Sequence, residues 1–184
     1  YVGGSSDAPQ SVDAFTRPYY KMINRLSASF SLTADMCLGL LAGDIKRKEM
    51  LSGRLADIHA QMFIATAILK FYEHGQKTDA EQAHARLALD NALYKTQDAF
   101  YDLFENFPIK FASALVKFIC FPLGRAVTKP TDQLKRDVAT YMMQDNAFRQ
   151  QLKQHVCYST DTNDVSGRME SAFQMLLKIE PLWN

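Results

Sequence analysis

Apolar residues recur at helical spacing over the first 73 positions of the chain. Two stripes stand out, one opening near Pro18 and one running from about Ile45 to Glu73. The first follows 4-3-4-4-3-4 spacing and the second alternates 4-3-4-3-4-3, and each fits one face of an α-helix. Gly43 is expected to end the first helix, and Asp44 to cap the second. The stripes are Tyr19, Ile23, Leu26, Phe30, Ala34, Cys37 and Leu41, then Leu51, Leu55, Ile58, Met62, Ala65, Leu69 and Tyr72.

The second predicted helix is apolar on more than one face towards its end. Four further apolar residues lie outside its stripe, so we expect its C-terminal half to be deeply buried. They are Phe63, Ile64, Ile68 and Phe71. Within the stripe itself, the expected core positions are Leu55, Ile58, Met62 and Leu69.

Helical signals continue through the second half of the chain. Thr78 and Glu81 form a capping box, which predicts a helix from Asp79 to just before Pro108. A later helix opens at Pro130-Thr131-Asp132, a short amphipathic stretch surrounds Phe148 and Leu152, and a last helix is predicted over 166–180. No segment alternates with the period of two that is typical of strands. The stripe of the third helix is Leu89, Leu93, Thr96, Phe100, Leu103 and Phe107.

Long helices joined by short loops predict an all-α fold, an antiparallel bundle of about five to six helices. Residues 1–17 are interpreted as a linker, and residues 18–184 as one helical domain of a larger protein.

A phenylalanine-rich helix is predicted over Ile109 to Ile119, between Pro108 and Pro122. Its polar residues Lys110, Ser113 and Lys117 share one helical stripe. Its broad apolar face is expected to contact one of three surfaces: the domain's own core, a partner domain or a membrane. We expect internal burial, because a surface-seeking helix usually carries a richer basic face.

Composition narrows the function classes. The 184 residues carry 21 basic and 20 acidic side chains, a balance that argues against a nucleic-acid partner. The three cysteines, Cys37, Cys120 and Cys157, show no metal-binding spacing and are expected to be reduced thiols. No secretory signal is visible, and no continuous run reaches the roughly 18 apolar residues of a membrane span.

The search for catalytic chemistry predicts no catalytic, cofactor-binding or metal-ligating residue. The histidines lack the spacing that places two ligands on one helical face, and no phosphate-binding glycine loop occurs. Asp161, Asn163 and Asp164 are interpreted as helix-capping residues and not as a calcium loop. Lys46-Arg47-Lys48 is interpreted as a solvated face, with phosphate or anionic lipid as the alternative. The histidines are His59, His74, His84 and His155.

Several blocks of the sequence resemble one protein family. Residues 43–58 read GDIKRKEMLSGRLADI, similar to a G-x-L-K-R-[RK]-E-x-L-S-x-R-L-[AG]-D block in the C-terminal region of the large bacterial acyl-CoA dehydrogenases of fatty-acid degradation. The match covers about Tyr20 to Leu134 well; Thr131 and Gln133 depart from the family's usual Ser and Lys. The other matching blocks are 67–73, 106–108, 121–125 and 130–134.

The resemblance implies a place in a larger enzyme. These dehydrogenases use FAD to introduce a trans double bond between C2 and C3 of a long-chain acyl-CoA, and their catalytic residues lie upstream. The chain then corresponds to the helical extension after that core, in a parent that is a homodimer. Similar extensions in very-long-chain relatives are linked with membrane attachment, so peripheral contact with the inner membrane of a cytoplasmic enzyme is a further expectation. The alternative is an independent helical interaction module without enzymatic activity.

Overall fold

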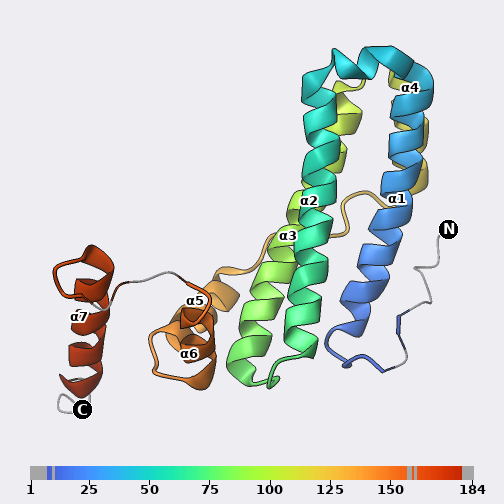
Figure 1. Cartoon of the computed structure of the whole chain (residues 1–184). Coiled ribbons are helices and arrows are strands. Elements are labelled where there is room, and N and C mark those ends of the chain that lie inside the picture. The colour runs from blue at the N-terminus through green and yellow to red at the C-terminus, as the bar shows by residue number, and fades with distance from the viewer. Residues whose placement is uncertain (1–7, 10, 157–158, 160, 180–184) are drawn as a thin grey trace.

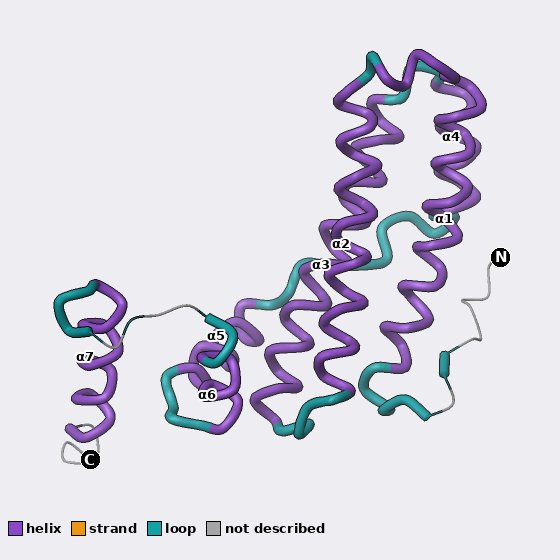
Figure 2. Tube along the Cα trace, viewed as in Figure 1, coloured by secondary structure: helices purple, strands orange, loops and turns teal. Residues whose placement is uncertain are grey.

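The computed structural model describes residues 8, 9, 11–156, 159 and 161–179, and within them every regular element is helical (Figures 1 and 2). The all-α prediction is therefore confirmed. The described part of the chain contains seven α-helices, whereas five to six were expected. The α-helices are α1 (Arg17–Leu41), α2 (Glu49–Glu73), α3 (Asp79–Asn106), α4 (Lys110–Cys120), α5 (Asp132–Met142), α6 (Ala147–Lys153) and α7 (Val165–Ile179), with the 3₁₀ turn η1 (Ala42–Lys46) between α1 and α2.

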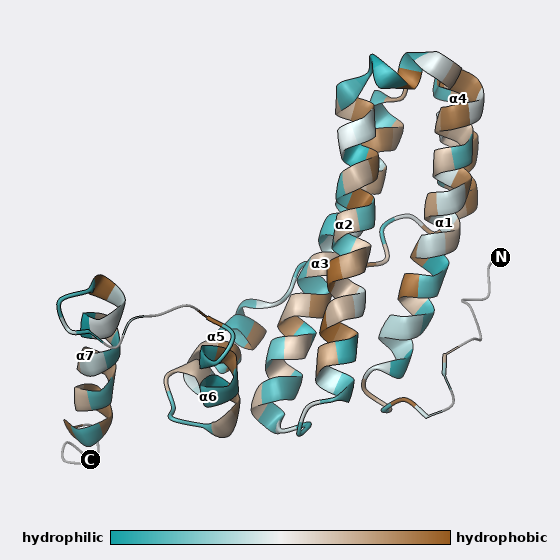
Figure 3. Cartoon of the chain, in the orientation of Figure 1, coloured by the Kyte–Doolittle hydropathy of each residue, from teal (hydrophilic) through white to brown (hydrophobic). Residues whose placement is uncertain are grey.

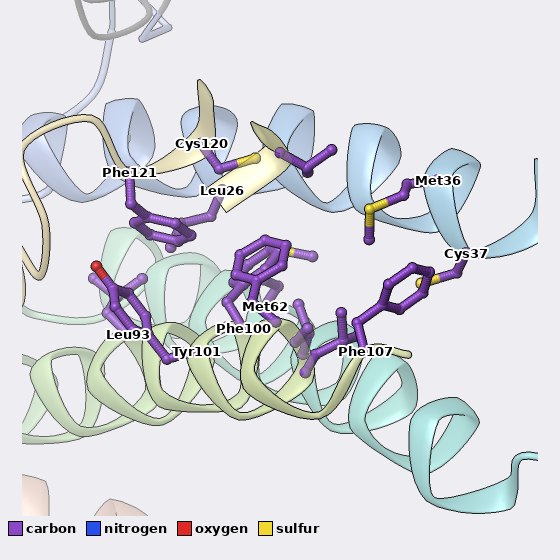
Figure 4. Close-up of a cluster of buried hydrophobic side chains, with 14 of the residues drawn as sticks. Leu26, Met36, Cys37, Met62, Leu93, Phe100, Tyr101, Phe107, Cys120 and Phe121 are labelled. Atoms are coloured by element: carbon purple, nitrogen blue, oxygen red, sulfur yellow. The ribbon is translucent and has the colours of Figure 1, made fainter. Parts of the chain in front are cut away.

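Three long helices, α1, α2 and α3, lie side by side, and α4 packs on α1 and α3 (Figure 1). Their facing stripes form one continuous core. Figure 4 shows Phe100 and Met62 at its centre, with Phe121 towards one end and Phe107 towards the other. The predicted stripe of α3 is buried at every position, because the heptad spacing keeps one face turned to its neighbours.

The start of α2 differs from the prediction. The residue with left-handed backbone geometry after α1 is Ala42, with φ 44°, and not Gly43. Asp44 lies inside η1, where its backbone carbonyl accepts from the N–H groups of Arg47 and Lys48. Helix α2 then begins at Glu49 behind Lys48, which makes no side-chain cap, so Asp44 does not cap α2 as expected.

The capping signals of α3 and α5 are confirmed. Thr78 accepts from the Glu81 N–H, and the Glu81 carboxylate accepts from the Thr78 N–H at 3.1 Å. Thr131 accepts from the Leu134 N–H at 3.2 Å at the start of α5. These caps satisfy backbone donors that have no partner inside the helix, and so fix where each helix begins.

The segment before α1 is anchored to the end of α2. The Glu73 carboxylate accepts from the Thr16 hydroxyl and from the Asp13 N–H, and it pairs with Lys77 at 2.8 Å. Thr16 is fully buried. The linker predicted for residues 1–17 therefore includes a described portion, from Asp13 onwards, that is held on the bundle.

The last three helices leave the bundle. Helix α5 lies against α3, α6 follows near the end where the chain turns from α2 into α3, and α7 stands clear of the long helices (Figure 1). Helix α7 is held to α6 by Glu170, which pairs with Arg149 at 3.0 Å and with Lys153 at 2.6 Å. Arg149 also covers the ring of Phe173, 3.8 Å from its centroid. One face of α7 therefore contacts α6.

Candidate functional site: exposed apolar faces

Helix α4 turns its polar stripe inwards. Ser113 is buried and its hydroxyl donates to the Phe104 carbonyl at 2.6 Å. Lys117 lies 4.4 Å from the centroid of the Tyr101 ring, and Lys110 donates to the Glu105 carbonyl. The polar side chains thus serve contacts to α3, because small and hydrogen-bonding residues allow α4 to approach closely.

Helix α4 is rich in hydrophobic residues (Figure 3), and its apolar face is consequently turned to the outside. Phe111 is 82% exposed, Phe118 67% and Leu115 51%. The prediction of internal burial is therefore wrong for these three residues, whereas Val116 of the same helix is buried in the core. It holds at the flanks, where Phe107 and Phe121 are buried in the core. We call the outward residues Phe111, Leu115, Phe118 and Ile119 the α4 face.

The C-terminal half of α2 is not deeply buried either. The stripe positions Ile58, Met62 and Leu69 are buried as predicted, whereas Leu55 is only partly buried and packs against the core. Of the four additional apolar residues, Phe63 is 70% exposed and Ile64 and Phe71 are also exposed, whereas Ile68 is partly buried and packs against the core. The expectation failed because α3, α1 and the segment before α1 cover only part of this half of α2, and the face with Phe63 and Ile64 stays exposed in the described structure.

These α2 residues line an apolar groove of about 720 Å³ between α2, α3 and α6. Its walls come almost entirely from carbon, which matches the usual character of binding sites of this size. Phe148 of α6 closes one end, buried against His84 and Phe71. We call this the α2–α3–α6 groove. Its principal apolar lining residues are Phe63, Ile64, Ala67, Ile68, Phe71, Ala85, Ala88, Phe148 and Leu152.

The histidines lie at separate places. His59 stacks on Phe30, and the Nδ1 atoms of His74 and His84 each lie 2.7 Å from the backbone carbonyl four residues before. His155 meets the ring of Phe71 edge-on. Within the described residues no group of three or more His, Cys, Asp or Glu side chains could hold a metal ion.

The described thiols are buried. Burial raises the pKa of the Cys37 thiol to about 11 and also raises the pKa of Cys120, whose Sγ lies 3.8 Å from the Ser29 carbonyl. A thiol needs its thiolate form to act as a nucleophile, so these two cysteines serve packing. The third cysteine, Cys157, lies outside the described residues.

The loop before α7 serves helix capping. The Asp164 carboxylate accepts from the Ser166 N–H at 3.1 Å, and the Asp161 carboxylate accepts from the Asn163 N–H at 2.9 Å. Gly167 is required here, because a Cβ at that position would lie 2.0 Å from the Asp161 carbonyl oxygen. The carboxylates of this loop are thus engaged by neighbouring backbone, in agreement with the capping interpretation.

Two parts of the chain are relevant to contact with a membrane: the helical segment Arg17–Lys46 and the basic run 46–48. The segment Arg17–Lys46 is long and apolar enough to cross a bilayer by length and composition, a test that core helices of soluble proteins also pass. In this structure the segment packs on α2 and α4 through Leu26, Cys37 and Leu41. The basic run 46–48 is exposed beside it, as expected for a solvated face.

Sequence reasoning missed the α2–α3–α6 groove. The available signal was the excess of apolar residues on α2 beyond its heptad stripe, which we interpreted as core. Such an excess of apolar residues predicts that the surface contacts something other than water, but it does not show which element or molecule makes that contact.

One protein family matches nearly the whole chain. A family described as acyl-CoA dehydrogenase, C-terminal, bacterial type, matches residues 2–184. No solved structure matches the chain.

Proposed function

Because the chain belongs to the family of bacterial-type acyl-CoA dehydrogenase C-terminal domains, we propose that it is the non-catalytic helical domain of an enzyme that oxidises long-chain acyl-CoA to trans-2-enoyl-CoA. The parent enzyme would hold FAD and the catalytic base in a dehydrogenase core upstream of this chain. Such a base is a carboxylate positioned against the substrate α-carbon.

The observation that carries the proposal is the outward α4 face. The domain already has its own continuous core, yet α4 presents Phe111, Leu115 and Phe118 to the outside. Exposed apolar patches of this kind mark sites of contact with another surface. We propose that the dehydrogenase core of the same polypeptide covers the α4 face.

A protein partner suits the α4 face better than a membrane does. Helices that lie on anionic bilayers carry many basic residues beside their apolar face. The two lysines of α4 are engaged elsewhere, Lys110 with the Glu105 carbonyl and Lys117 over the Tyr101 ring. The proposal accordingly describes a cytoplasmic enzyme in which α4 meets protein.

The catalytic part of the proposal is tested by flavin content. The isolated 184-residue chain should purify colourless and should not oxidise palmitoyl-CoA, whereas the parent enzyme should retain FAD and reduce it with that substrate. Stoichiometric flavin on the isolated chain would contradict the proposal.

Co-sedimentation with anionic lipid vesicles tests the choice between protein and membrane. The chain should remain in the supernatant at low salt. If it pellets, and a folded Phe111→Ser/Phe118→Ser variant does not, the membrane and not the dehydrogenase core covers the α4 face.

A further inference from the structure

Helix α7 carries an apolar stripe that no other described residue covers. Its residues follow 4-3-4-3 spacing and are exposed, with Met169 at 69%, Leu176 at 50% and Ile179 at 47%. The helix holds α6 through a different face, which presents Glu170, Phe173 and Gln174. The α7 stripe is Val165, Met169, Ala172, Leu176 and Ile179.

The α7 stripe and the α2–α3–α6 groove are both apolar. The groove is apolar and presents no unengaged charge: the Glu81 carboxylate among its lining residues is committed to the capping box. The α7 stripe consists of uncharged residues over 15 helical positions, which is about 22 Å of helix. Amphipathic helices bind such grooves through residues at these spacings.

We propose that α7 of one copy of this chain docks in the α2–α3–α6 groove of a second copy, and that the exchange is reciprocal. Docking in its own groove would require α7 to leave α6, breaking the Glu170 pairs with Arg149 and Lys153. Docking in a second copy keeps those contacts, because α7 already projects away from its own bundle (Figure 1). The proposal rests on these described surfaces and not on the proposed function.

The exposed apolar area favours a reciprocal exchange, with two α7–groove contacts, over the docking of a single α7 helix. Given about 150–250 Å² for an aromatic side chain and somewhat less for an aliphatic one, complete burial of the exposed groove and stripe residues would remove at most about 750 Å² for one helix in one groove. That falls within the range of crystal-packing contacts, below about 800 Å². Two contacts related by a two-fold axis bury at most about 1,500 Å², the size of a standard stable interface.

Sedimentation velocity on the 184-residue chain tests the exchange. The wild-type chain, 20.9 kDa as a monomer, should sediment as a dimer at high micromolar concentration. Two variants with unchanged helical circular dichroism, Met169→Ser/Leu176→Ser in the stripe and Phe63→Ser/Ile64→Ser in the groove, should each raise the dimer dissociation constant at least about tenfold. The matched control is Phe111→Ser/Phe118→Ser on the α4 face, which should leave dimerisation unchanged.

Mixing the two variants gives the sharpest test. The stripe variant retains an intact groove and the groove variant retains an intact stripe, so a heterodimer in an equimolar mixture has one intact contact; the mixture should associate more weakly than the wild-type chain and more tightly than either variant alone. A monomeric wild-type chain would overturn the proposal. So would a dimer that both variants preserve, or a dimer that only the control disrupts.

Discussion

At the scale of single residues, Gln97 joins α3 to the chain segment that follows α4. Its side chain is 1% exposed, and its amide oxygen accepts from the N–H groups of Ala126 at 2.8 Å and Val127 at 3.0 Å. Its amide nitrogen donates to the Val127 carbonyl at 2.9 Å. One side chain thus satisfies three backbone groups of a segment without regular structure, which fixes the path from α4 to α5.

Replacing Gln97 with Leu should release this segment. The substitution leaves three backbone groups without their partner, and each such group costs about 1–3 kcal/mol if it stays buried. Because the segment can move towards water, we expect a loss of about 2–3 kcal/mol in the free energy of unfolding. Hydrogen exchange at Ala126 and Val127 should accelerate together with the loss measured by urea denaturation. Unchanged exchange at both amides would show that other contacts hold the segment.

The buried stripe of α2 makes a second residue-scale prediction. Ile58 and Leu69 are fully buried, so truncating either to Ala should lower the free energy of unfolding by about 2–5 kcal/mol. Phe63→Ala on the same helix is the control, and as an exposed site in the monomer it should change stability by less than about 0.5 kcal/mol. Urea denaturation at low protein concentration measures all three. Equal losses at Ile58 and Phe63 would contradict this division of α2 into a buried stripe and an exposed one.

At the scale of elements, α7 depends on a pair of ionic contacts. Hydrogen bonds from Lys153 and then from Arg149 lower the pKa of Glu170 to about 2. The contact of α7 with α6 therefore includes a carboxylate that is stabilised in its charged form. A 15-residue helix is only marginally stable by itself in water, so these contacts help to keep α7 helical.

Acid should therefore loosen α7. A group whose pKa is depressed in the folded state contributes stability above its unfolded pKa, near 4.3–4.5, and that contribution is lost as the pH falls towards the folded pKa. We expect the protection of α7 amides from hydrogen exchange, relative to the intrinsic rate at each pH, to fall between about pH 4.5 and pH 2, more steeply than in α3. The Glu170→Gln variant should show a weaker pH dependence over this range. An equally steep dependence in that variant would exclude Glu170 as its source.

Some elements could be predicted from sequence and others could not. The stripe of α3 and the caps at Thr78 and Thr131 act locally, so periodicity and capping residues were sufficient to place them. The orientation of α4 depends on a distant partner, because the Ser113 hydroxyl finds the Phe104 carbonyl and Cys120 packs at Ser29. Sequence alone could not show that these contacts outweigh the usual outward placement of a polar stripe.

At the scale of the whole molecule, a complete core coexists with apolar surfaces that remain uncovered. Core residues from α1 to α4 pack together, yet the α4 face, the α2–α3–α6 groove and the α7 stripe all lie outside this core. Apolar residues in a sequence identify surfaces that avoid water, and they do not identify which molecule provides the cover. The predicted fold class was therefore correct while the predicted burial of Phe63 and Phe111 was wrong.

The central claim is that the α4 face docks on the dehydrogenase core. Isothermal titration calorimetry between this chain and its separately produced, FAD-loaded dehydrogenase core tests that claim most directly. The account predicts saturable binding, weakened at least about tenfold by Phe111→Ser/Phe118→Ser and unchanged by the groove variant Phe63→Ser/Ile64→Ser. Binding of equal strength by the α4 variant, or no binding by the wild-type chain, would contradict it.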